Sequence, residues 1–257
     1  MIFDSHAHYD DKAFDQDRES LLCSLKEKGI GRVVNISSDL ESIGRTEALT
    51  GQYPFLYGAA GVHPSDTGAL TEENFSRIGE AFRNPKMVAV GEIGLDYHWP
   101  EPDKAVQKKW FERQLALAAE KRLPVVIHSR EAARDTLDMI RAAGGSELSA
   151  VIHCFSYGVE MAREYLNMGH YLGIGGVVTF ANAKKLKEVV QYMPLSQMLL
   201  ETDCPYLAPV PYRGKRNDSA NLSYVAETVA QLKGISREEA EAVTYENACR
   251  FYRLEEA

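Results

Sequence analysis

Short runs of apolar and β-branched residues alternate along the whole chain with longer segments in which apolar residues recur at helical spacing. Eight of the short runs are predicted strands: residues 1–6, 32–37, 55–62, 87–93, 124–128, 150–155, 171–178 and 198–203. The clearest predicted helices cover residues 103–122 and 181–193. Near the C-terminus, Ser236 and Glu239 have capping-box spacing ahead of a helical run that ends near Tyr252.

This regular alternation predicts βα units around a parallel sheet. Eight units in 257 residues give roughly 32 residues each, the size expected of a closed (β/α)8 TIM barrel of about 250 residues. No linker or low-complexity segment interrupts the pattern, so we expect a single α/β domain over residues 1–257. An open, doubly wound sheet is the alternative architecture.

Ionisable residues interrupt or end several apolar runs, and a parallel strand is buried on both faces. Asp4, His6 and His8 alternate along the first run, so we expect them to project to the same side. Other runs contain or end in a histidine or a carboxylate: Glu92, His128, His153 and Asp203. In a (β/α)8 barrel the C-terminal ends of the strands form the active-site face, so these side chains are predicted to converge there.

Four imidazoles and two carboxylates in one barrel mouth point to bound cations, because so many buried ionisable groups would otherwise be costly. The predicted ligands are His6, His8, Glu92, His128, His153 and Asp203. Six ligands are too many for one tetrahedral ion. Two divalent ions that share a bridging carboxylate, about 3.5 to 4 Å apart, fit this set better. Zn²⁺ is the favoured ion, and Mn²⁺, Mg²⁺, Fe²⁺ and Ni²⁺ are the other options.

The net charge narrows the range of partners. Lys and Arg total 29 against 37 Asp and Glu, a formal charge of −8, which excludes a broad cationic surface that binds long stretches of nucleic acid. No run of about 18 apolar residues occurs and the first residues do not resemble a signal peptide, so we expect a cytoplasmic protein with no membrane association. Four widely spaced cysteines are expected to stay reduced. The oligomeric state is left open, with a monomer as one option.

Six segments together resemble the TatD family of metal-dependent deoxyribonucleases, and the similarity extends in order over the whole chain. The segments are MIFDSHAHYD at residues 1–10, GVHP at 61–64, GEIGLDY at 91–97, IHSR at 127–130, IHCF at 152–155 and ETDCPYL at 201–207. The resemblance implies a (β/α)8 barrel, a centre of divalent metal ions and hydrolysis of DNA phosphodiester bonds, often from an end.

Carried over to this sequence, the resemblance divides the ligands between two ions. It implies one ion held by His6, His8, Glu92 and Asp203, and a second held by Glu92, His128 and His153. Glu92 is then the bridge. The resemblance further implies that His63 contacts the substrate phosphate or a metal-bound water, and that Glu201 orients a ligand. We expect a hydroxide between the two ions to attack phosphorus, with Asp203 as the proton acceptor.

The loop at residues 208–217 is the most basic short stretch of the chain, and it follows the eighth predicted strand. Barrels commonly bind phosphate near strands 7 and 8, so Arg213, Lys215 and Arg216 are predicted to bind the phosphates of a DNA substrate together with His63. Residues 218–222 (DSANL) depart from the Glu-Pro that usually follows Arg-Asn in the family. The expected partner is DNA, as single strands or strand ends.

Two other functions fit parts of the pattern. The first is an amidohydrolase or lactonase that acts on a cyclic amide or ester, because such barrels share the HxH motif, two later histidines and an aspartate. Glu92 argues against it, since many members of that class have a lysine at the fourth strand. The second is a metal-containing nucleic-acid binding module without catalysis, for which the sequence has no RNP aromatics, basic stripe or finger spacing.

Overall fold

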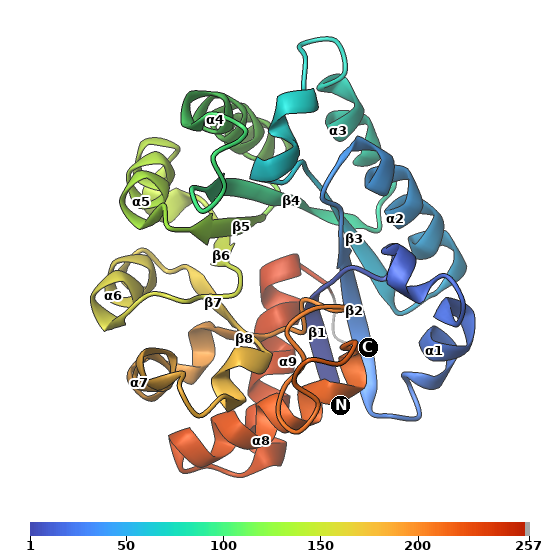
Figure 1. Ribbon diagram of the computed structural model, residues 1–257, viewed down its shortest axis with the longest axis vertical. Coiled ribbons are helices and arrows are strands. Elements are labelled where there is room, and N and C mark those ends of the chain that lie inside the picture. The colour runs from blue at the N-terminus through green and yellow to red at the C-terminus, as the bar shows by residue number, and fades with distance from the viewer. Residues whose placement is uncertain (255–257) are drawn as a thin grey trace.

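The computed structural model describes residues 1–254, and its centre is one sheet of eight parallel strands in the order β1 to β8 (Figure 1). The strands are β1 (Ile2–Ala7), β2 (Ile30–Ile36), β3 (Leu56–Ala60), β4 (Met87–Asp96), β5 (Val125–Arg130), β6 (Ala150–Ile152), β7 (Tyr171–Ile174) and β8 (Met198–Leu200). A bridge between Ala7 and Cys204 joins the first and last strands, and the amide of Asp203 donates to the carbonyl of His6 at 2.9 Å. The fold is therefore the predicted (β/α)8 TIM barrel.

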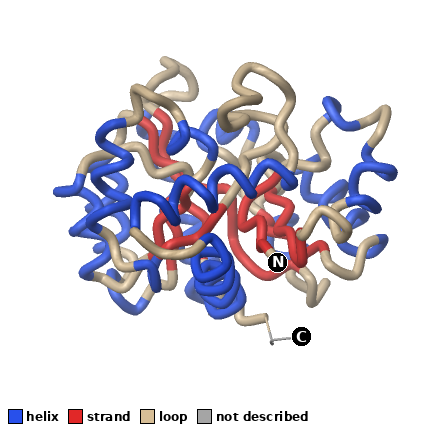
Figure 2. The backbone as a smooth tube through the Cα atoms, turned by 90° about the horizontal axis from the view of Figure 1, so that it is seen from below, coloured by secondary structure: helices blue, strands red, loops and turns tan. Residues whose placement is uncertain are grey.

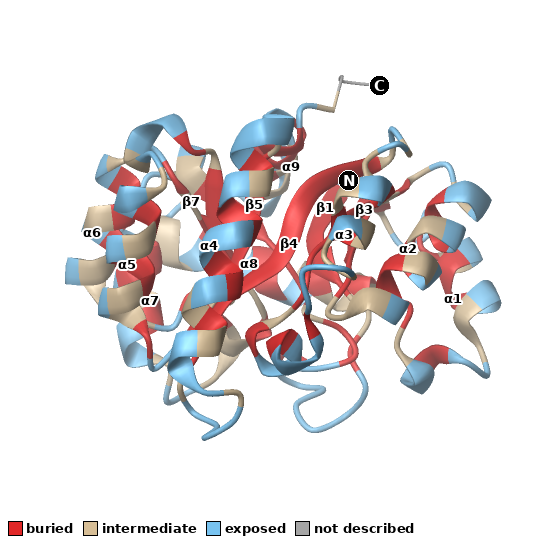
Figure 3. Cartoon of the chain, turned by 90° about the horizontal axis from the view of Figure 1, so that it is seen from above, coloured by how far each residue is buried: buried red, intermediate tan, exposed pale blue. Residues whose placement is uncertain are grey.

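Helices surround the strands and turn their buried sides toward them (Figure 3). They are α1 (Arg18–Ser24), α2 (Leu40–Gln52), α3 (Ser76–Ala81), α4 (Lys104–Lys121), α5 (Ala133–Ala142), α6 (Val159–Asn167), α7 (Lys184–Tyr192), α8 (Leu222–Lys233) and α9 (Arg237–Tyr252). Helix α9 begins as predicted, since the side chain of Ser236 accepts from the amide of Glu239 at 3.0 Å. Within residues 1–254, no helix has both the length and the apolar character needed to cross a bilayer.

Most strands differ by one or more residues from their predicted ranges, and β3 ends at Ala60 instead of residue 62. Strand β4 continues to Asp96, whereas β6, β7 and β8 end at Ile152, Ile174 and Leu200, before the predicted ends at 155, 178 and 203. After β7 the chain enters a 3₁₀ turn at Gly176–Thr179 instead of continuing as a strand. A side chain at Gly176 would collide with the backbone at Leu207 and Pro209, so the loops after β7 and β8 pack closely here.

Helix α9 closes the end of the barrel at which the strands begin. Its C-terminal turns join Phe3 and inward-facing residues of other strands in one apolar cluster. The ring of Tyr252 stacks on Phe3 at 5.9 Å, and its hydroxyl donates to the carbonyl of Ser5 at 2.7 Å. The N-terminus lies on this side of the molecule with the end of α9, and long loops gather on the opposite side (Figure 2). The carboxyl ends of the strands are thus left open for a site.

Candidate active site

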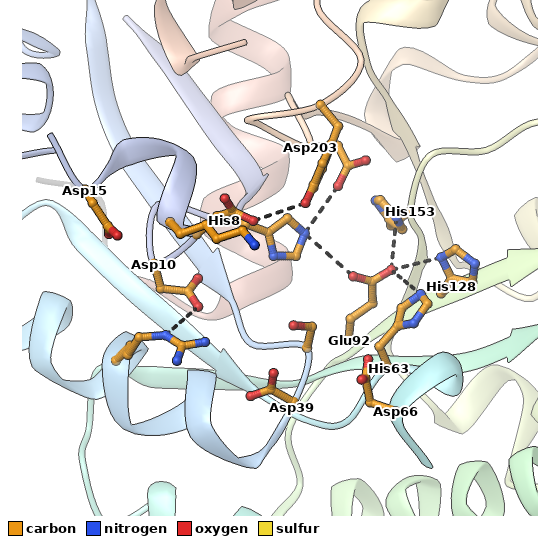
Figure 4. A pocket seen from close by; sticks show the side chains of 15 residues that line it. His8, Asp10, Asp15, Asp39, His63, Asp66, Glu92, His128, His153 and Asp203 are labelled. Atoms are coloured by element: carbon orange, nitrogen blue, oxygen red, sulfur yellow. Dashed lines mark hydrogen bonds and ion pairs between the residues drawn. The ribbon is translucent and has the colours of Figure 1, made fainter. Parts of the chain in front are cut away.

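The six predicted ligands gather at the carboxyl ends of the strands, although they come from distant parts of the sequence. His6, Glu92 and His128 lie within β1, β4 and β5, whereas His8, His153 and Asp203 lie shortly after β1, β6 and β8. Five of the six line a cavity of about 570 Å³, and the exception is His6, which is fully buried behind it. The loops after β1, β2 and β3 form the outer wall of this cavity (Figure 4).

The carboxylate of Glu92 lies at the centre of the cluster (Figure 4). Its Oε2 atom is 3.4 Å from Nε2 of His6 and 3.8 Å from Nε2 of His8. Its Oε1 atom is 3.0 Å from Nδ1 of His128 and 3.2 Å from Nε2 of His153. One carboxylate therefore faces two pairs of imidazoles, one pair with each oxygen, which is the geometry expected of a bridging ligand.

His6, His8 and Asp203 form one group of atoms that could hold a cation, since their ligand atoms lie within 4.8 Å of one another. Oδ1 of Asp203 is 3.3 Å from Nε2 of His8 and 3.6 Å from Nε2 of His6. Asp4 does not join them, contrary to the expectation from strand alternation. The pairing register of β1 shifts between Asp4 and Ala7, and the Asp4 carboxylate instead accepts from the Thr202 and Ser219 hydroxyls.

His63, Glu92 and His128 form a second such group. Nε2 of His63 is 3.8 Å from Oε1 of Glu92, and its ring lies edge-on to that of His128 at 4.4 Å. Burial lowers the pKa of His63 to about 4, so its imidazole is neutral at pH 7. Its Nδ1 accepts from the amide of Ser65 at 3.1 Å, which leaves Nε2 to face the cluster. The resemblance implied that His63 contacts the substrate phosphate or a metal-bound water, and the structure groups it with Glu92 and His128, while His153 groups with His6 and Glu201.

In three of the histidines, one ring nitrogen faces the cluster and the other ring nitrogen contacts a partner outside it. Nδ1 of His8 is 2.8 Å from the carbonyl of Ile36, Nε2 of His128 is 3.0 Å from Oδ2 of Asp96, and Nδ1 of His153 is 3.3 Å from Oε1 of Glu201. Metal-binding histidines typically have such partners, which fix the ring and leave the other nitrogen for the ion. The donor set therefore fits divalent cations such as Zn²⁺.

Asp96 is a site residue that the sequence analysis did not assign. It ends β4 four residues after Glu92, whereas the predicted strand ends at residue 93 and leaves Asp96 outside. The even spacing from Glu92 within one strand is the signal that would have placed both side chains on one face. Glu201, in contrast, is where the resemblance implied. Its carboxylate accepts from the amide of Cys154 and packs against Gly173, where any β-carbon would collide with it.

The carboxylates of the cluster are charged at neutral pH. Burial alone would raise the pKa of Glu92, but the imidazoles of His153 and His6 hold it well below its usual range. Burial likewise opposes ionisation of Asp203, and the hydrogen bond with His8 is the largest of the interactions that lower its pKa. Two anionic oxygen ligands are thus available.

The same contacts act on the imidazoles. Burial would lower the pKa of His8, but its hydrogen bond with Asp203 raises it to about 9, and carboxylates likewise raise the pKa values of His128 and His153. A cation that binds here would therefore displace protons from these imidazoles.

The basic loop after β8 does not reach into the cavity, since none of its three cations is among the lining residues. Arg213 and Lys215 form no ion pair with any residue of 1–254, so both remain available for phosphate. Arg216 differs from the prediction, because both of its terminal nitrogens donate to the carboxylate of Asp17 at 2.6 and 2.7 Å. This ion pair connects the loop to the start of α1 and occupies the guanidinium.

The outer wall of the cavity is acidic, which the sequence analysis did not anticipate. Five carboxylates line it in addition to the candidate ligands, against one lysine and one arginine: Asp10, Asp11, Asp15, Asp39, Asp66, Lys12 and Arg45. Arg45 is itself 2.6 Å from Glu41 and 3.5 Å from Asp10. The loops after β1 to β3 therefore present a surface that repels a polyanion.

Comparison with known proteins agrees with this geometry. Residues 3–253 match the family model described as "TatD related DNase". The chain is 43% identical to the "uncharacterized metal-dependent hydrolase YabD" of Bacillus subtilis, covering 99% of this chain and all of that one. It is 36% identical to the "uncharacterized metal-dependent hydrolase TatD" of Mycobacterium tuberculosis, covering 98% of each.

Among solved structures, the TatD homologue YjjV of Escherichia coli superimposes with a TM-score of 0.93 at 28% identity, over 99% of this chain and 98% of that one. An E. coli phosphotriesterase homology protein shares the fold with a TM-score of 0.69 at 14% identity, over 98% of each chain. The match over nearly the full length, with the candidate ligands at the strand ends, is decisive. The chain belongs to the TatD family of metal-dependent hydrolases.

Proposed function

We propose that the protein hydrolyses DNA phosphodiester bonds from strand ends with two divalent ions, foremost Zn²⁺, held by the six predicted ligands. The observation that carries this proposal is the position of Glu92, whose two carboxylate oxygens face two separate pairs of histidines. A carboxylate shared in this way suits ions about 3.5 to 4 Å apart, the spacing of two-metal sites that hydrolyse phosphate esters.

When bound, the ions would supply Lewis acidity for the phosphoryl oxygens and would lower the pKa of a water molecule toward neutrality. Asp203 is the proton acceptor for that water. It lies at the edge of the cavity with 18% of its side chain exposed, and its ion pairs with His6 and His8 both use Oδ1. His63 lies on the opposite side of Glu92, where it contacts either an ion or the substrate phosphate.

The preference for strand ends follows from the distribution of charge around the mouth. A continuous duplex would have to pass over the acidic wall formed by the loops after β1 to β3, where five aspartates face the cavity. On the loop after β8, by contrast, Arg213 and Lys215 form no ion pair with any described residue. A strand end needs only its terminal phosphodiester at the ions, and its remaining phosphates can leave over that loop.

The experiment is a substrate panel with protein reconstituted with Zn²⁺ or Mn²⁺. We expect nucleotides to be released from end-labelled single-stranded DNA, slower attack on blunt duplex, and no cutting of covalently closed circular DNA. Asp203→Asn, which keeps the volume of the side chain, should lose most of the turnover. RNA, a cyclic amide and a lactone complete the panel. Hydrolysis of the amide or lactone without cleavage of DNA would overturn the proposal in favour of an amidohydrolase.

A further inference from the structure

The loop that follows β8 has an unusual concentration of exposed apolar side chains. Tyr206 is 55% exposed, Leu207 38%, Val210 46% and Tyr212 36%. These side chains belong to one short segment beside the candidate active site, whereas isolated exposed apolar residues are normal on any surface. Tyr206 also lines the cavity itself, so one end of this segment forms part of the rim of the mouth.

Contacts with the neighbouring loop after β1 hold this segment in place. The hydroxyl of Tyr206 donates to Oδ2 of Asp11, which belongs to that loop, at 3.1 Å. Arg216 forms its paired hydrogen bonds with Asp17, donates to the carbonyl of Ala13 at 2.9 Å, and packs over the ring of Phe14. The ring of Tyr206 is therefore positioned before any ligand binds, with more than half of its surface uncovered.

The same segment carries the cations that have no carboxylate partner. The guanidinium of Arg213 lies 4.3 Å from the centre of the Phe180 ring, and the ammonium of Lys215 lies 5.9 Å from that of Tyr212. Exposed aromatic rings interleaved with unpaired cations are the combination by which proteins bind single-stranded nucleic acids, with rings stacking on bases and cations contacting phosphates. In the wall formed by the loops after β1 to β3, five aspartates outnumber one lysine and one arginine.

We propose that Tyr206 is a stacking platform for the terminal nucleobase of the substrate strand, and that Arg213 and Lys215 contact the phosphates that follow it. This inference rests on the proposed hydrolysis of DNA ends and adds a residue that selects the substrate. A terminal base on the ring of Tyr206 would place its phosphodiester toward the cavity, while the rest of the strand leaves away from the five aspartates. Stacking does not depend on base identity, so the protein would prefer strand ends without a sequence preference.

The test is a cycle of two changes, one in the protein and one in the substrate. Three proteins are compared: the parent, Tyr206→Ala and Tyr206→Phe. Each is assayed on two substrates, a single-stranded oligonucleotide and the same strand with abasic residues at both ends. Tyr192→Ala is the matched control, since Tyr192 is 45% exposed at the end of α7 and does not line the cavity. The measured quantities are KM and kcat for each pair, with thermal unfolding to verify that each variant folds.

We expect Tyr206→Ala to raise KM for the normal strand by about fivefold or more, the low end of the effect of removing one base-stacking ring. For the parent, removal of the terminal bases should raise KM by about the same factor as Tyr206→Ala does on the normal strand. For Tyr206→Ala, removal of the terminal bases should not raise KM further. Tyr206→Phe keeps the ring and should retain most of the affinity, and Tyr192→Ala should match the parent.

Equal losses for Tyr206→Ala on the normal and abasic strands would overturn the inference, because Tyr206 would then act only through its contact with Asp11. An unchanged KM for Tyr206→Ala would overturn it as well. Both results require a parent that cleaves DNA. A parent that leaves both strands intact would instead contradict the proposed function, so the two failures are distinguishable.

Discussion

Replacement of Glu92 by glutamine tests whether one carboxylate serves two ions. The carboxylate has ion-pair contacts of 3.0 to 3.8 Å with five imidazoles, from His6, His8, His63, His128 and His153. An amide of the same shape has one oxygen, and its NH₂ group cannot be a ligand. Replacement of residues that merely orient ligands typically costs about 10- to 100-fold in metal affinity or activity. Loss of a shared ligand weakens both ion sites, so Glu92→Gln should cost more than 100-fold in kcat.

The assay combines elemental analysis with steady-state hydrolysis at saturating metal. The parent should bind about two equivalents of Zn²⁺ or Mn²⁺, since six ligands with one bridge require two ions. Glu92→Gln should bind about one equivalent or less, and His63→Ala should lose less activity than Glu92→Gln. The matched control is Glu131→Gln, which changes an exposed carboxylate whose partner is His98 at 2.8 Å.

Full activity of the parent with a single equivalent of metal would refute the shared-bridge reasoning. A second informative result concerns His63. Losses of equal size in His63→Ala and Glu92→Gln would mean that His63 is itself a metal ligand, as its grouping with Glu92 and His128 allows. In that case the division of ligands implied by the family resemblance would need revision, with His63 added to the second ion.

Two further predictions concern charge. Because Arg216 is paired with Asp17, we expect Arg213 and Lys215 to be the two cations of the loop after β8 that contact phosphates, so log Kd for single-stranded DNA against log salt should have a slope of magnitude near 0.7 × 2, roughly 1.4. Arg213→Ala should halve this slope and Arg216→Ala should leave it unchanged, whereas a magnitude above about 6 would reveal a second binding surface. His170 is fully buried without a side-chain partner among residues 1–254, and burial lowers its pKa to about 4. The unfolded chain, with a pKa near 6.5, then binds more protons, so the free energy of unfolding should fall by about 2 kcal/mol between pH 7 and pH 5, and urea titrations of His170→Phe should lack this component.

The barrel and the convergence of the six candidate ligands could be predicted from the sequence because both depend on local patterns. Short apolar runs define the strands, and in a parallel barrel every strand ends on the same face, so polar residues at strand ends must meet. Glu92 and Asp203 lie 3.4 and 3.6 Å from Nε2 of His6 in this way, although almost 200 residues separate His6 from Asp203. This convergence could be predicted without knowing which of these residues contact one another.

The finer geometry depends on contacts that local patterns do not encode. The register of β1 shifts between Asp4 and Ala7, and the Asp4 carboxylate accepts from the hydroxyls of Thr202 and Ser219 instead of joining His6 and His8 in the cluster. The pairing of Arg216 with Asp17 joins residues 199 positions apart, and the sequence shows only a basic residue in a basic loop. Position along a strand places a side chain at the mouth, whereas the neighbour it contacts there is decided by loop packing.

The ligands and the substrate-facing charges therefore belong to different parts of the structure. The ligands lie at or just beyond strand ends, and the closed barrel fixes their spacing through the hydrogen bonds of its backbone. The free cations and exposed rings lie on the loop after β8, which is held to the rest of the mouth by only a few side chains, chiefly Arg216 and Tyr206. Changes in this loop can alter which molecule is bound without disturbing the candidate metal centre. The same cluster of histidines and carboxylates could thus serve different substrates, and under our proposal the loop, more than the ligand set, selects a strand end.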